Sequence, residues 1–433
     1  MAAHAIVVVD LGFGDAGKGS LTDHLAHRHG ARLVVRFNGG AQAGHNVVTD
    51  DGRHHTFAQL GAASFEPRAR THLAAPFVLH PTALQVEARH LEAKGVPDPL
   101  ARLTLSPRAL LITPFHQHLN QLRERARGAA RHGTCGVGVG EAVGFALSRP
   151  ERAIRAEALA DPDLEDRVVA LRDALRHEAE SLAAQCDGSM SPFDDDELPA
   201  RWSAAARALA ARLRDDAEVI PEALERDPAV LFEGAQGVLL DEWHGFHPHT
   251  TWSTCTFDNA LALLALAGHR GEVTRVGVLR AYSTRHGEGP FPTDDPTFAR
   301  ALPEPHNGGG GWQGRFRAGP LDLVLARYAL AACGGVDALA VTHLDRVREG
   351  WPVCDGYALR DGPRWVTAGG AIRSMRALET RDLTAQRALG EALRGVRPLL
   401  ERWDGDLSAR ISSALNAPVR WRSYGPRRGD TRS

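Results

Sequence analysis

An apolar run that leads into a glycine-rich loop is the feature that most restricts the fold of this chain. Residues 6–9 are all β-branched, which predicts a short buried strand. Gly12, Gly14 and Gly17 follow, and such glycines permit a tight turn in which backbone N–H groups surround an anion at the start of a helix. Because the ammonium group of Lys18 suits a phosphate, we predict a strand, a phosphate-binding loop and a helix in this order.

Asp15 lies inside the same loop, where its charge has the wrong sign for an anion site. A carboxylate there repels phosphate unless it binds a metal ion or accepts a proton. A turn without a ligand needs neither Asp15 nor Lys18, so a purely structural loop is the weaker interpretation. The loop therefore indicates chemistry as well as binding.

Two nucleotide-binding motifs compete for this loop. The dinucleotide motif GxGxxG, which begins at Gly12, requires an acidic residue at the end of the next strand to bind a ribose. That strand is predicted at 33–35, and none of the residues 36–38 after it is acidic. The mononucleotide motif GxxxxGK[ST] fits up to its lysine, but Gly19 stands where a hydroxyl should bind Mg²⁺. Neither motif is complete.

Apolar strand-like runs alternate with helical patterns rich in alanine, leucine and arginine over most of the chain. Such alternation predicts an α/β fold with a large, mostly parallel central sheet and flanking helices, in a P-loop-like nucleotide-binding architecture. Residues from about 151 to 225 have a helical pattern throughout, and we expect them to form an insertion or subdomain within a single domain of residues 1–433. The predicted strands are 6–9, 33–35, 109–113, 229–232, 276–279 and 338–342, and the predicted helices include 21–29, 81–94, 116–130 and 321–332.

The composition excludes several functional classes. The net charge of −2 gives no bulk attraction to nucleic acid or to an anionic membrane. The five cysteines include no Cys-x-x-Cys pair, which argues against a disulfide framework or a thiolate zinc site. The sequence has no signal-peptide pattern and no apolar stretch long enough to cross a membrane. We therefore expect a cytoplasmic protein that binds neither nucleic acid nor membranes.

Further glycine-marked or polar segments follow strand-like runs. Because the carboxyl ends of parallel strands form the ligand-binding edge of an α/β sheet, we expect these segments to meet there. A glycine-rich stretch at 306–312 precedes two arginines, and we expect it to form a lid over the site. The other segments are 36–45, 133–140, 232–237, 250–256, 281–293 and 341–345.

Together these segments resemble the adenylosuccinate synthetase family over nearly the whole chain, in the same order and with similar spacing. The resemblance implies a GTP- and Mg²⁺-dependent ligase that joins L-aspartate to a purine nucleoside monophosphate. It also implies that IMP is the default acceptor, that the reaction passes through an intermediate phosphorylated on the 6-oxygen, and that the enzyme is a homodimer. The segments that carry the resemblance are Gly14-Asp-Ala-Gly-Lys-Gly19, Ala43-Gly-His45, Phe232-Glu-Gly-Ala-Gln-Gly237, Ala281-Tyr-Ser-Thr-Arg285, Gly289-Pro-Phe-Pro-Thr293, Leu344-Asp345 and Ser423-Tyr-Gly-Pro426.

The resemblance implies catalytic roles for residues of the phosphate loop and its neighbours. Asp15 matches the base that removes the N1 proton of the purine, and Asp15 with the carbonyl of Gly44 matches the Mg²⁺ ligands. Lys18 matches the lysine that bridges phosphoryl groups, and His45 matches the acid that stabilises charge on the departing diphosphate. Gln236 matches a hydrogen-bond partner of the purine 6-oxygen. Catalysis by such a set is positioning and charge stabilisation.

The resemblance also implies how three substrates are bound. Arg315 and Arg317 match the residues that bind aspartate, since two guanidinium forks suit its two carboxylates. Asp345 matches the residue that reads the guanine edge. The acceptor nucleotide is contacted by Gln42, Thr134, Thr251 and Arg149, the arginine coming from the partner subunit. The residues implied to bind GTP are Gly14, Gly17, Gly19, His343, Asp345, Ser423, Gly425 and Pro426.

The sequence departs from the family pattern at positions that contact substrates. Ala16 stands where the family has Glu, and Ala41-Gln42 stands where it has His-Asn. Cys135 replaces a phosphate-binding Thr, Val137 replaces an Arg, and His343 replaces a Lys before the guanine reader. Because the residues of the chemistry are retained, we predict a synthetase for IMP or a paralogue that aminates a variant purine-like nucleotide. A non-catalytic nucleotide-binding protein and a nicotinamide dehydrogenase are weaker alternatives.

Overall fold

Nine strands form the central sheet of the computed structural model, which describes residues 3–304, 311–358, 367–368, 370–378 and 381–433. All pairings in this sheet are parallel except that between its last two strands along the chain. The predicted α/β fold with a large, mostly parallel sheet is therefore confirmed. In the order of the sheet, the strands are β20 (Thr431–Arg432), β19 (Val419–Ser423), β14 (Ala338–Thr342), β10 (Val273–Arg280), β1 (His4–Asp10), β9 (Ala229–Glu233), β2 (Leu33–Arg36), β5 (Arg70–Leu73) and β7 (Leu103–Leu105).

Strand β1 lies between β9 and β10 in the middle of the sheet. All of its residues after His4 are buried, as expected for a parallel strand that is covered on both faces. Ile6 and Val8 join the core beneath α1 (Lys18–His29), whereas Val7 and Val9 join a larger core on the opposite face. Each such side chain stabilises the fold by about 1.5–3 kcal/mol. The strand that leads into the phosphate loop is therefore anchored from both sides.

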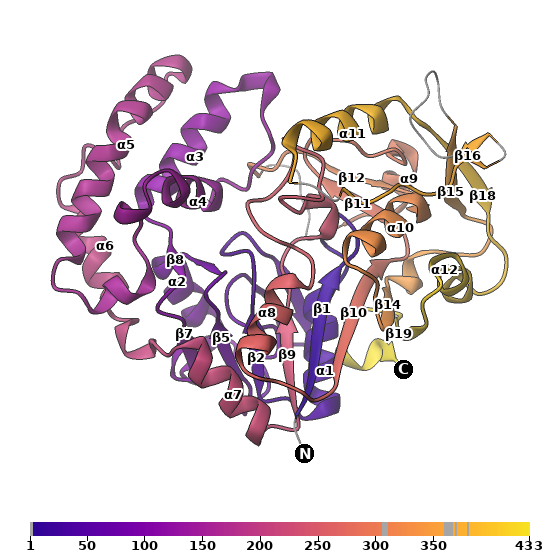
Figure 1. Cartoon of the computed structure of the whole chain (residues 1–433), viewed down its shortest axis with the longest axis horizontal. Coiled ribbons are helices and arrows are strands. Elements are labelled where there is room, and N and C mark those ends of the chain that lie inside the picture. The colour runs from indigo at the N-terminus through magenta and orange to yellow at the C-terminus, as the bar shows by residue number, and fades with distance from the viewer. Residues whose placement is uncertain (1–2, 305–310, 359–366, 369, 379–380) are drawn as a thin grey trace.

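Helices lie on both flanks of the sheet, with α3 to α6 grouped on one side of Figure 1 and α9 to α12 on the other. Among the described residues, none of the helices is long and apolar enough to span a membrane. The helices after α1 are α2 (Pro81–Glu92), α3 (Pro114–Ala126), α4 (Val139–Ser148), α5 (Leu164–Cys186), α6 (Leu198–Arg207), α7 (Asp216–Arg226), α8 (Asp258–Leu266), α9 (Pro296–Ala301), α10 (Leu323–Ala332), α11 (Leu383–Gly395) and α12 (Leu407–Leu415).

The helical stretch predicted at 151–225 contains α5, α6 and α7. Helix α5 packs against α3, and α6 packs against α2 and α5. Leu171 of α5 and Trp202 of α6 are buried in the same core as Leu119 of α3. These helices thus share a hydrophobic core with the segment that precedes them.

Short strands outside the central sheet shape the loops above it. The predicted strand at 109–113 is extended only at Leu110–Leu111 and lies in one of these small sheets, because its backbone bonds to residues 79 and 154 rather than to the central sheet. Strands β5, β7, β19 and β20 of the central sheet were not predicted. The small sheets consist of β3 (His45–Val48) with β4 (His54–Phe57), β6 (Val78–Leu79) with β8 (Leu110–Leu111), β11 (Ser283–His286) with β12 (Phe316–Gly319), and β13 (Leu321–Asp322) with β15 (Pro352–Ala358), β16 (Thr367–Ala368), β17 (Ala371–Ile372) and β18 (Arg397–Arg402).

Candidate active site

A cavity of about 1220 Å³ opens at the carboxyl ends of β1, β9, β10 and β14. This is the edge at which α/β sheets bind ligands. The fold brings together at this cavity all of the predicted site residues except Arg315 and Arg317. Those that line it are Gly14, Asp15, Gly17, Lys18, Gly19, Gln42, Gly44, His45, Thr134, Arg149, Gln236, Thr251, His343, Asp345, Ser423, Gly425 and Pro426.

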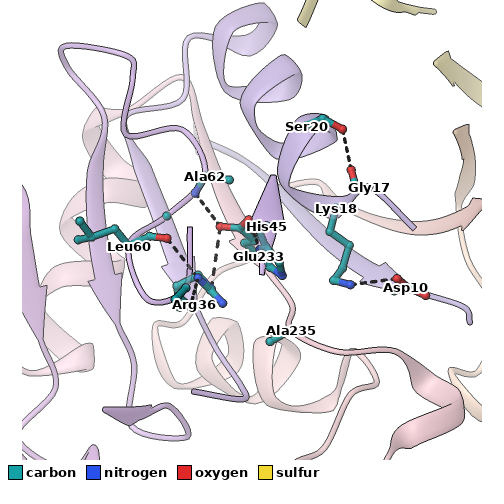
Figure 2. A network of polar contacts seen from close by, with 12 residues as sticks. Asp10, Gly17, Lys18, Ser20, Arg36, His45, Leu60, Ala62, Glu233 and Ala235 are labelled. Atoms are coloured by element: carbon teal, nitrogen blue, oxygen red, sulfur yellow. Dashed lines mark hydrogen bonds and ion pairs between the residues drawn. The ribbon is translucent and has the colours of Figure 1, made fainter. Parts of the chain in front are cut away.

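The carboxylate of Asp10, the last residue of β1, organises the phosphate loop. Its Oδ1 accepts the N–H of Gly12 at 2.7 Å, and its Oδ2 accepts the N–H of Ala16 at 2.9 Å. Oδ2 also accepts a hydrogen bond from Nζ of Lys18 at 3.0 Å, and both side chains are buried (Figure 2). Gly17 precedes α1 with φ +89°, which glycine adopts without strain. The loop therefore closes onto the first turn of α1, as an anion site requires.

Two neighbouring strands hold the peptide groups of the same loop. At the end of β14, Oγ1 of Thr342 donates a hydrogen bond to the carbonyl of Ala16 at 2.7 Å. At the end of β10, Nη1 of Arg280 donates to the carbonyl of Asp15 at 3.3 Å. Because side chains of two neighbouring strands bind these carbonyls, the protein itself fixes the conformation of the loop.

Steric crowding explains why position 19, where the mononucleotide motif has Ser or Thr, is a glycine. A Cβ atom at position 19 would lie only 2.7 Å from Cβ of His45, because β3 passes directly over the first turn of α1. The side-chain hydroxyl that the motif places here therefore has no room. The next hydroxyl, Oγ of Ser20, donates to the carbonyl of Gly17 at 3.0 Å.

Asp15 reaches the cavity from a strained backbone, with φ +61°. Gln236 and His343 in the cavity wall also have positive φ, and such conformations cost on the order of 1–3 kcal/mol and cluster at functional sites. Oδ2 of Asp15 lies 3.0 Å from Nε2 of His286. Burial alone would raise the pKa of Asp15, but the hydrogen bond and charge of His286, with the charge of Arg280, outweigh it and lower the pKa. Asp15 is therefore ionised at neutral pH and can bind a cation or accept a proton.

His45, the first residue of β3, is held by a buried carboxylate. Its Nδ1 lies 2.7 Å from Oε1 of Glu233, the last residue of β9, and Oε2 of Glu233 accepts the N–H of Ala62 at 3.0 Å (Figure 2). Nε of Arg36 lies 4.0 Å from the same Oε2, and the Arg36 and Glu233 side chains are fully buried.

The protonation states of Glu233 and His45 depend on two opposing effects, burial and ion pairing. Burial would raise the pKa of Glu233, but His45 and Arg36 outweigh burial and lower it. Burial, together with the charges of Arg36 and Lys18, lowers the pKa of His45 against the opposing effect of Glu233. Glu233 is therefore ionised and His45 is neutral, with its proton on Nδ1 because a carboxylate can only accept. Nε2 of His45 is left as the site for a second proton.

Two side-chain amides in the cavity wall have unused hydrogen-bonding capacity. Within the described residues, both amide atoms of Gln42 and Oε1 of Gln236 are buried without a hydrogen-bond partner. Asn38 fixes the backbone before Gln236, since Nδ2 of Asn38 donates to the carbonyl of Ala235 and its Oδ1 accepts the N–H of Ala235. A buried polar group without a partner costs about 1–3 kcal/mol. A ligand with complementary groups would remove this cost.

The loop around Thr134 is fixed by Glu124 of α3. The Glu124 carboxylate accepts the N–H of Gly133 at 2.9 Å and that of Thr134 at 3.4 Å. Burial raises the pKa of Cys135, the next residue, to about 11. Its thiol is therefore neutral at pH 7 and adds no charge to this part of the wall. Arg149 follows α4 and brings a cation to the same cavity.

His343 and Asp345 follow β14 at another part of the wall. Burial lowers the pKa of His343, so its imidazole is neutral. Burial also raises the pKa of Asp345. Oγ of Ser423, at the end of β19, donates to the carbonyl of Gly425 at 3.0 Å and closes the turn beside them.

Arg315 and Arg317, predicted to bind aspartate, are not among the residues of the cavity lining. Nη2 of Arg315 and Nη1 of Arg317 lie 3.4 Å and 3.5 Å from the same Oδ2 of Asp294. The two arginines are thus side by side and share an internal carboxylate. Residues 306–310 of the predicted lid lie outside the described residues.

Three residues of the site had no role in the sequence analysis: Asp10, Glu233 and His286. Each is the last residue of a strand, namely β1, β9 and β11. A charged or polar residue that directly ends an apolar strand was the available signal for Asp10 and Glu233. For His286 the sequence gave no comparable signal, because its contact with Asp15 depends on how β11 is placed over the sheet.

A phosphate loop between a central strand and a helix, with titratable side chains gathered above it, defines a nucleotide-binding α/β enzyme. Comparison with known proteins gives the family. The family model for adenylosuccinate synthetase matches residues 7–432, so the chain belongs to the adenylosuccinate synthetase family, which consists of GTP-dependent carbon–nitrogen ligases.

Relatives and solved structures agree with this family. The adenylosuccinate synthetase of Desulforudis audaxviator is 34% identical over 443 residues, covering 98% of this chain and 97% of the relative. That of Myxococcus xanthus is 31% identical over 433 residues, covering 98% and 97%. The fully ligated adenylosuccinate synthetase of Plasmodium falciparum shares the fold, with a TM-score of 0.78, 23% identity and 98% coverage of each chain. A cyanophage S-2L succinoaminodeoxyadenylate synthetase bound to dGMP and dATP is a more distant structure, with a TM-score of 0.60, 18% identity and coverage of 100% of this chain and 95% of that one.

Proposed function

We propose that this enzyme joins L-aspartate to C6 of IMP with GTP as the phosphoryl donor. The observation that carries the proposal is the convergence of Asp15, Lys18, His45 and Gln236 on one cavity. Its volume of about 1220 Å³ exceeds the 300–1,000 Å³ that is usual for one small ligand, which leaves room for two nucleotides.

The proposed reaction has two steps. Asp15 accepts the N1 proton of IMP, and the charge that develops on O6 is stabilised by Gln236. O6 forms a bond to the γ-phosphorus of GTP while the bond to the β–γ bridging oxygen breaks, and GDP leaves. The amine of aspartate then attacks C6 and displaces inorganic phosphate. Most of the rate enhancement comes from positioning and charge stabilisation in a site that excludes water.

His45 and Lys18 act on the phosphates in this scheme. A diphosphate next to Nε2 of His45 favours a proton there, and Glu233 behind the ring stabilises the resulting imidazolium. Nζ of Lys18 donates a hydrogen bond to Asp10, and Lys18 lines the cavity beside the phosphate loop. A short movement of Nζ would let it share its protons with a phosphate oxygen.

The residues present fit Mg²⁺ as a cofactor. Mg²⁺ is usually bound by one or two carboxylates together with substrate phosphates. Asp15 offers one ionised carboxylate in the phosphate loop, and Gly44, an exposed residue of the same wall, offers its carbonyl. These two groups would hold the ion, which would neutralise charge on the transferred phosphoryl group.

We also propose that the chain is a single domain and acts as a homodimer in which Arg149, which lines the cavity of its own subunit, extends to the partner's site. Leu147, two residues earlier, is 70% exposed at the cavity rim, where a partner subunit would cover it. Mixing an Asp15→Ala variant with an Arg149→Ala variant tests the arrangement. If Arg149 acts across subunits, mixed dimers contain one intact site and activity returns. If each subunit uses its own Arg149, no mixed dimer has an intact site and the mixture stays inactive.

A second candidate is a synthetase for a variant purine nucleotide. It is favoured by Gln42, whose amide is unsatisfied in the cavity wall, and by the neutral Cys135 in place of a threonine. A cyanophage relative in fold is a synthetase bound to dGMP. Both candidates use the same chemistry and differ only in the acceptor.

One substrate panel separates these possibilities. The enzyme is supplied with GTP or ATP, L-aspartate, and IMP, GMP or dGMP, and products are identified by mass spectrometry. We expect adenylosuccinate, GDP and phosphate to form only when IMP and aspartate are both present. Product from GMP or dGMP instead of IMP would favour the variant acceptor. Hydrolysis of GTP that needs neither aspartate nor a purine monophosphate would refute the ligase.

A further inference from the structure

His286 ends strand β11 at the wall of the cavity, with Arg285 and Glu288 beside it in the same wall. In the register of β11 with β12, His286 lies opposite Phe316. The two rings are in edge-to-face contact, with centroids 4.8 Å apart and planes at 65°. This contact and the strand pairing fix where the imidazole lies. His286 is therefore a rigid element of the site rather than a mobile surface side chain.

The Asp15 carboxylate depends on His286 for its orientation. Nε2 of His286 lies 3.0 Å from Oδ2 of Asp15, and this is the only ion pair of Asp15 within the described part of the chain. The other nearby cations are engaged elsewhere. Lys18 binds the carboxylate of Asp10, and Arg280 binds the backbone carbonyl of Asp15 rather than its side chain.

Asp15 needs such a support because its own segment provides little. It lies between Gly14 and Ala16, and its side chain is 33% exposed. A carboxylate on a short side chain in an open glycine loop can rotate, and a displacement of about 1 Å from the reacting atom can cost about a hundredfold in rate. Binding of Oδ2 by His286 removes this freedom, and the remaining lone pairs of Oδ1 and Oδ2 stay available to the purine and to Mg²⁺.

We propose that His286 is a positioning residue, which holds the carboxylate of Asp15 in the orientation that accepts the purine N1 proton. The inference rests on the proposed function, because it concerns the step that Asp15 performs. This role requires an N–H donor at the position of Nε2. The reaction rate of a variant at position 286 should therefore depend on whether its side chain can donate this hydrogen bond and not on the size of the side chain.

The experiment isolates the phosphoryl-transfer step. GTP labelled with ¹⁸O at the β–γ bridge is incubated with enzyme, Mg²⁺ and IMP but without aspartate, and movement of the label into non-bridging positions of the β-phosphate reports reversible transfer to O6. In His286→Val we expect scrambling and kcat to fall by about ten- to a hundredfold, the range for loss of a residue that orients a reacting ligand, with KM for GTP nearly unchanged. His286→Gln keeps an N–H donor and should recover much of the rate.

A variant on the same strand is the matched control. Oγ of Ser283 accepts the N–H of Asp322 at 3.1 Å, and Ser283 is not part of the cavity lining. Ser283→Ala disturbs β11 without touching Asp15, so its scrambling rate should stay near that of the wild type. Wild-type scrambling in His286→Val, faster scrambling there, or equal loss in the Val, Gln and Ser283→Ala variants would overturn the proposal. No scrambling in the wild-type enzyme would instead refute the proposed function.

Discussion

Glu233→Gln tests the most deeply buried part of the site. The substitution keeps the shape of the side chain but replaces one acceptor oxygen with an N–H₂ donor. If the remaining oxygen keeps the N–H of Ala62, the amide nitrogen faces Nδ1 of His45, and His45 must carry its proton on Nε2 instead. The imidazolium also loses the negative charge 2.7 Å away that stabilises it.

The size of the effect follows from these contacts. Glu233 orients His45 and stabilises its protonated form. Removing its charge should therefore lower kcat by about 10²- to 10⁴-fold, the usual contribution of general acid catalysis. Stability should fall as well, because buried Arg36 loses Glu233, the stronger of the two carboxylates whose charge acts on it, and breaking a buried ion pair typically costs about 3–5 kcal/mol. The carbonyls of residues 58, 59 and 60 accept hydrogen bonds from Arg36. Because these bonds remain in the variant, the loss in the free energy of unfolding should be about 3 kcal/mol or less.

Glu87→Gln is the matched control. Glu87 is also a buried glutamate, and its carboxylate accepts the N–H groups of Ala58, Gln59 and Leu60 in the same segment that Arg36 binds. It does not line the cavity. Unfolding in urea and steady-state kinetics should show that both variants lose stability but that only Glu233→Gln loses kcat by more than tenfold. A folded Glu233→Gln protein with kcat within about threefold of the wild type would refute the assigned role of His45.

Three further outcomes follow from the described contacts. Asp345→Asn replaces one acceptor oxygen with a donor, so the kcat/KM ratio of GTP to ATP should fall about 10- to 100-fold; an unchanged ratio removes Asp345 from guanine recognition. Gly237→Ala should abolish GTP binding in a calorimetric titration, because a Cβ atom there would overlap the carbonyl of Gly12 and the amide of Gly14; normal affinity would contradict this packing. Burial lowers the pKa of His116 from 6.5 to about 3, so the unfolded chain takes up this proton at a higher pH than the folded protein. The contribution of His116 to the free energy of unfolding should therefore be fully present above pH 6.5 and decrease by up to about 1.4 kcal/mol per pH unit as the pH drops towards 3. If the free energy of unfolding of His116→Gln has the same pH dependence as that of the wild type, His116 is not its source.

Local patterns were enough to predict the centre of the fold. The strand at 6–9, its glycine loop and α1 are adjacent in sequence, and their apolar and glycine positions follow directly from the structure they adopt. The outer strands β5 and β7 were missed because they are short and contain Arg70, His72 and Thr104. Their pairing with β2 and with each other, and the covering helices, stabilise these segments as strands, which a local pattern does not reveal.

The sequence predicted those residues of the site that lie in family motifs. Asp15, His45 and Gln236 lie in short motifs, and their convergence on one cavity follows from the parallel order of the strands. The contact of Glu233 with His45 joins positions 188 residues apart, and that of His286 with Asp15 joins a strand of a small sheet to the loop that follows β1 of the central sheet. Neither contact leaves a periodicity or spacing in the sequence, so only the folded arrangement reveals them.

The pairing of Lys18 with Asp10 has a consequence for selectivity. A phosphate loop with an unpaired lysine would attract small anions such as inorganic phosphate. Because Asp10 already pairs with Lys18 inside the protein, the lysine offers a single anion no unpaired charge. A single weakly held anion gains little there. A ligand with several phosphate groups, bound at the same time through its base and ribose, gains enough to draw Nζ of Lys18 into a shared hydrogen bond, so the loop discriminates by the number of simultaneous contacts rather than by charge.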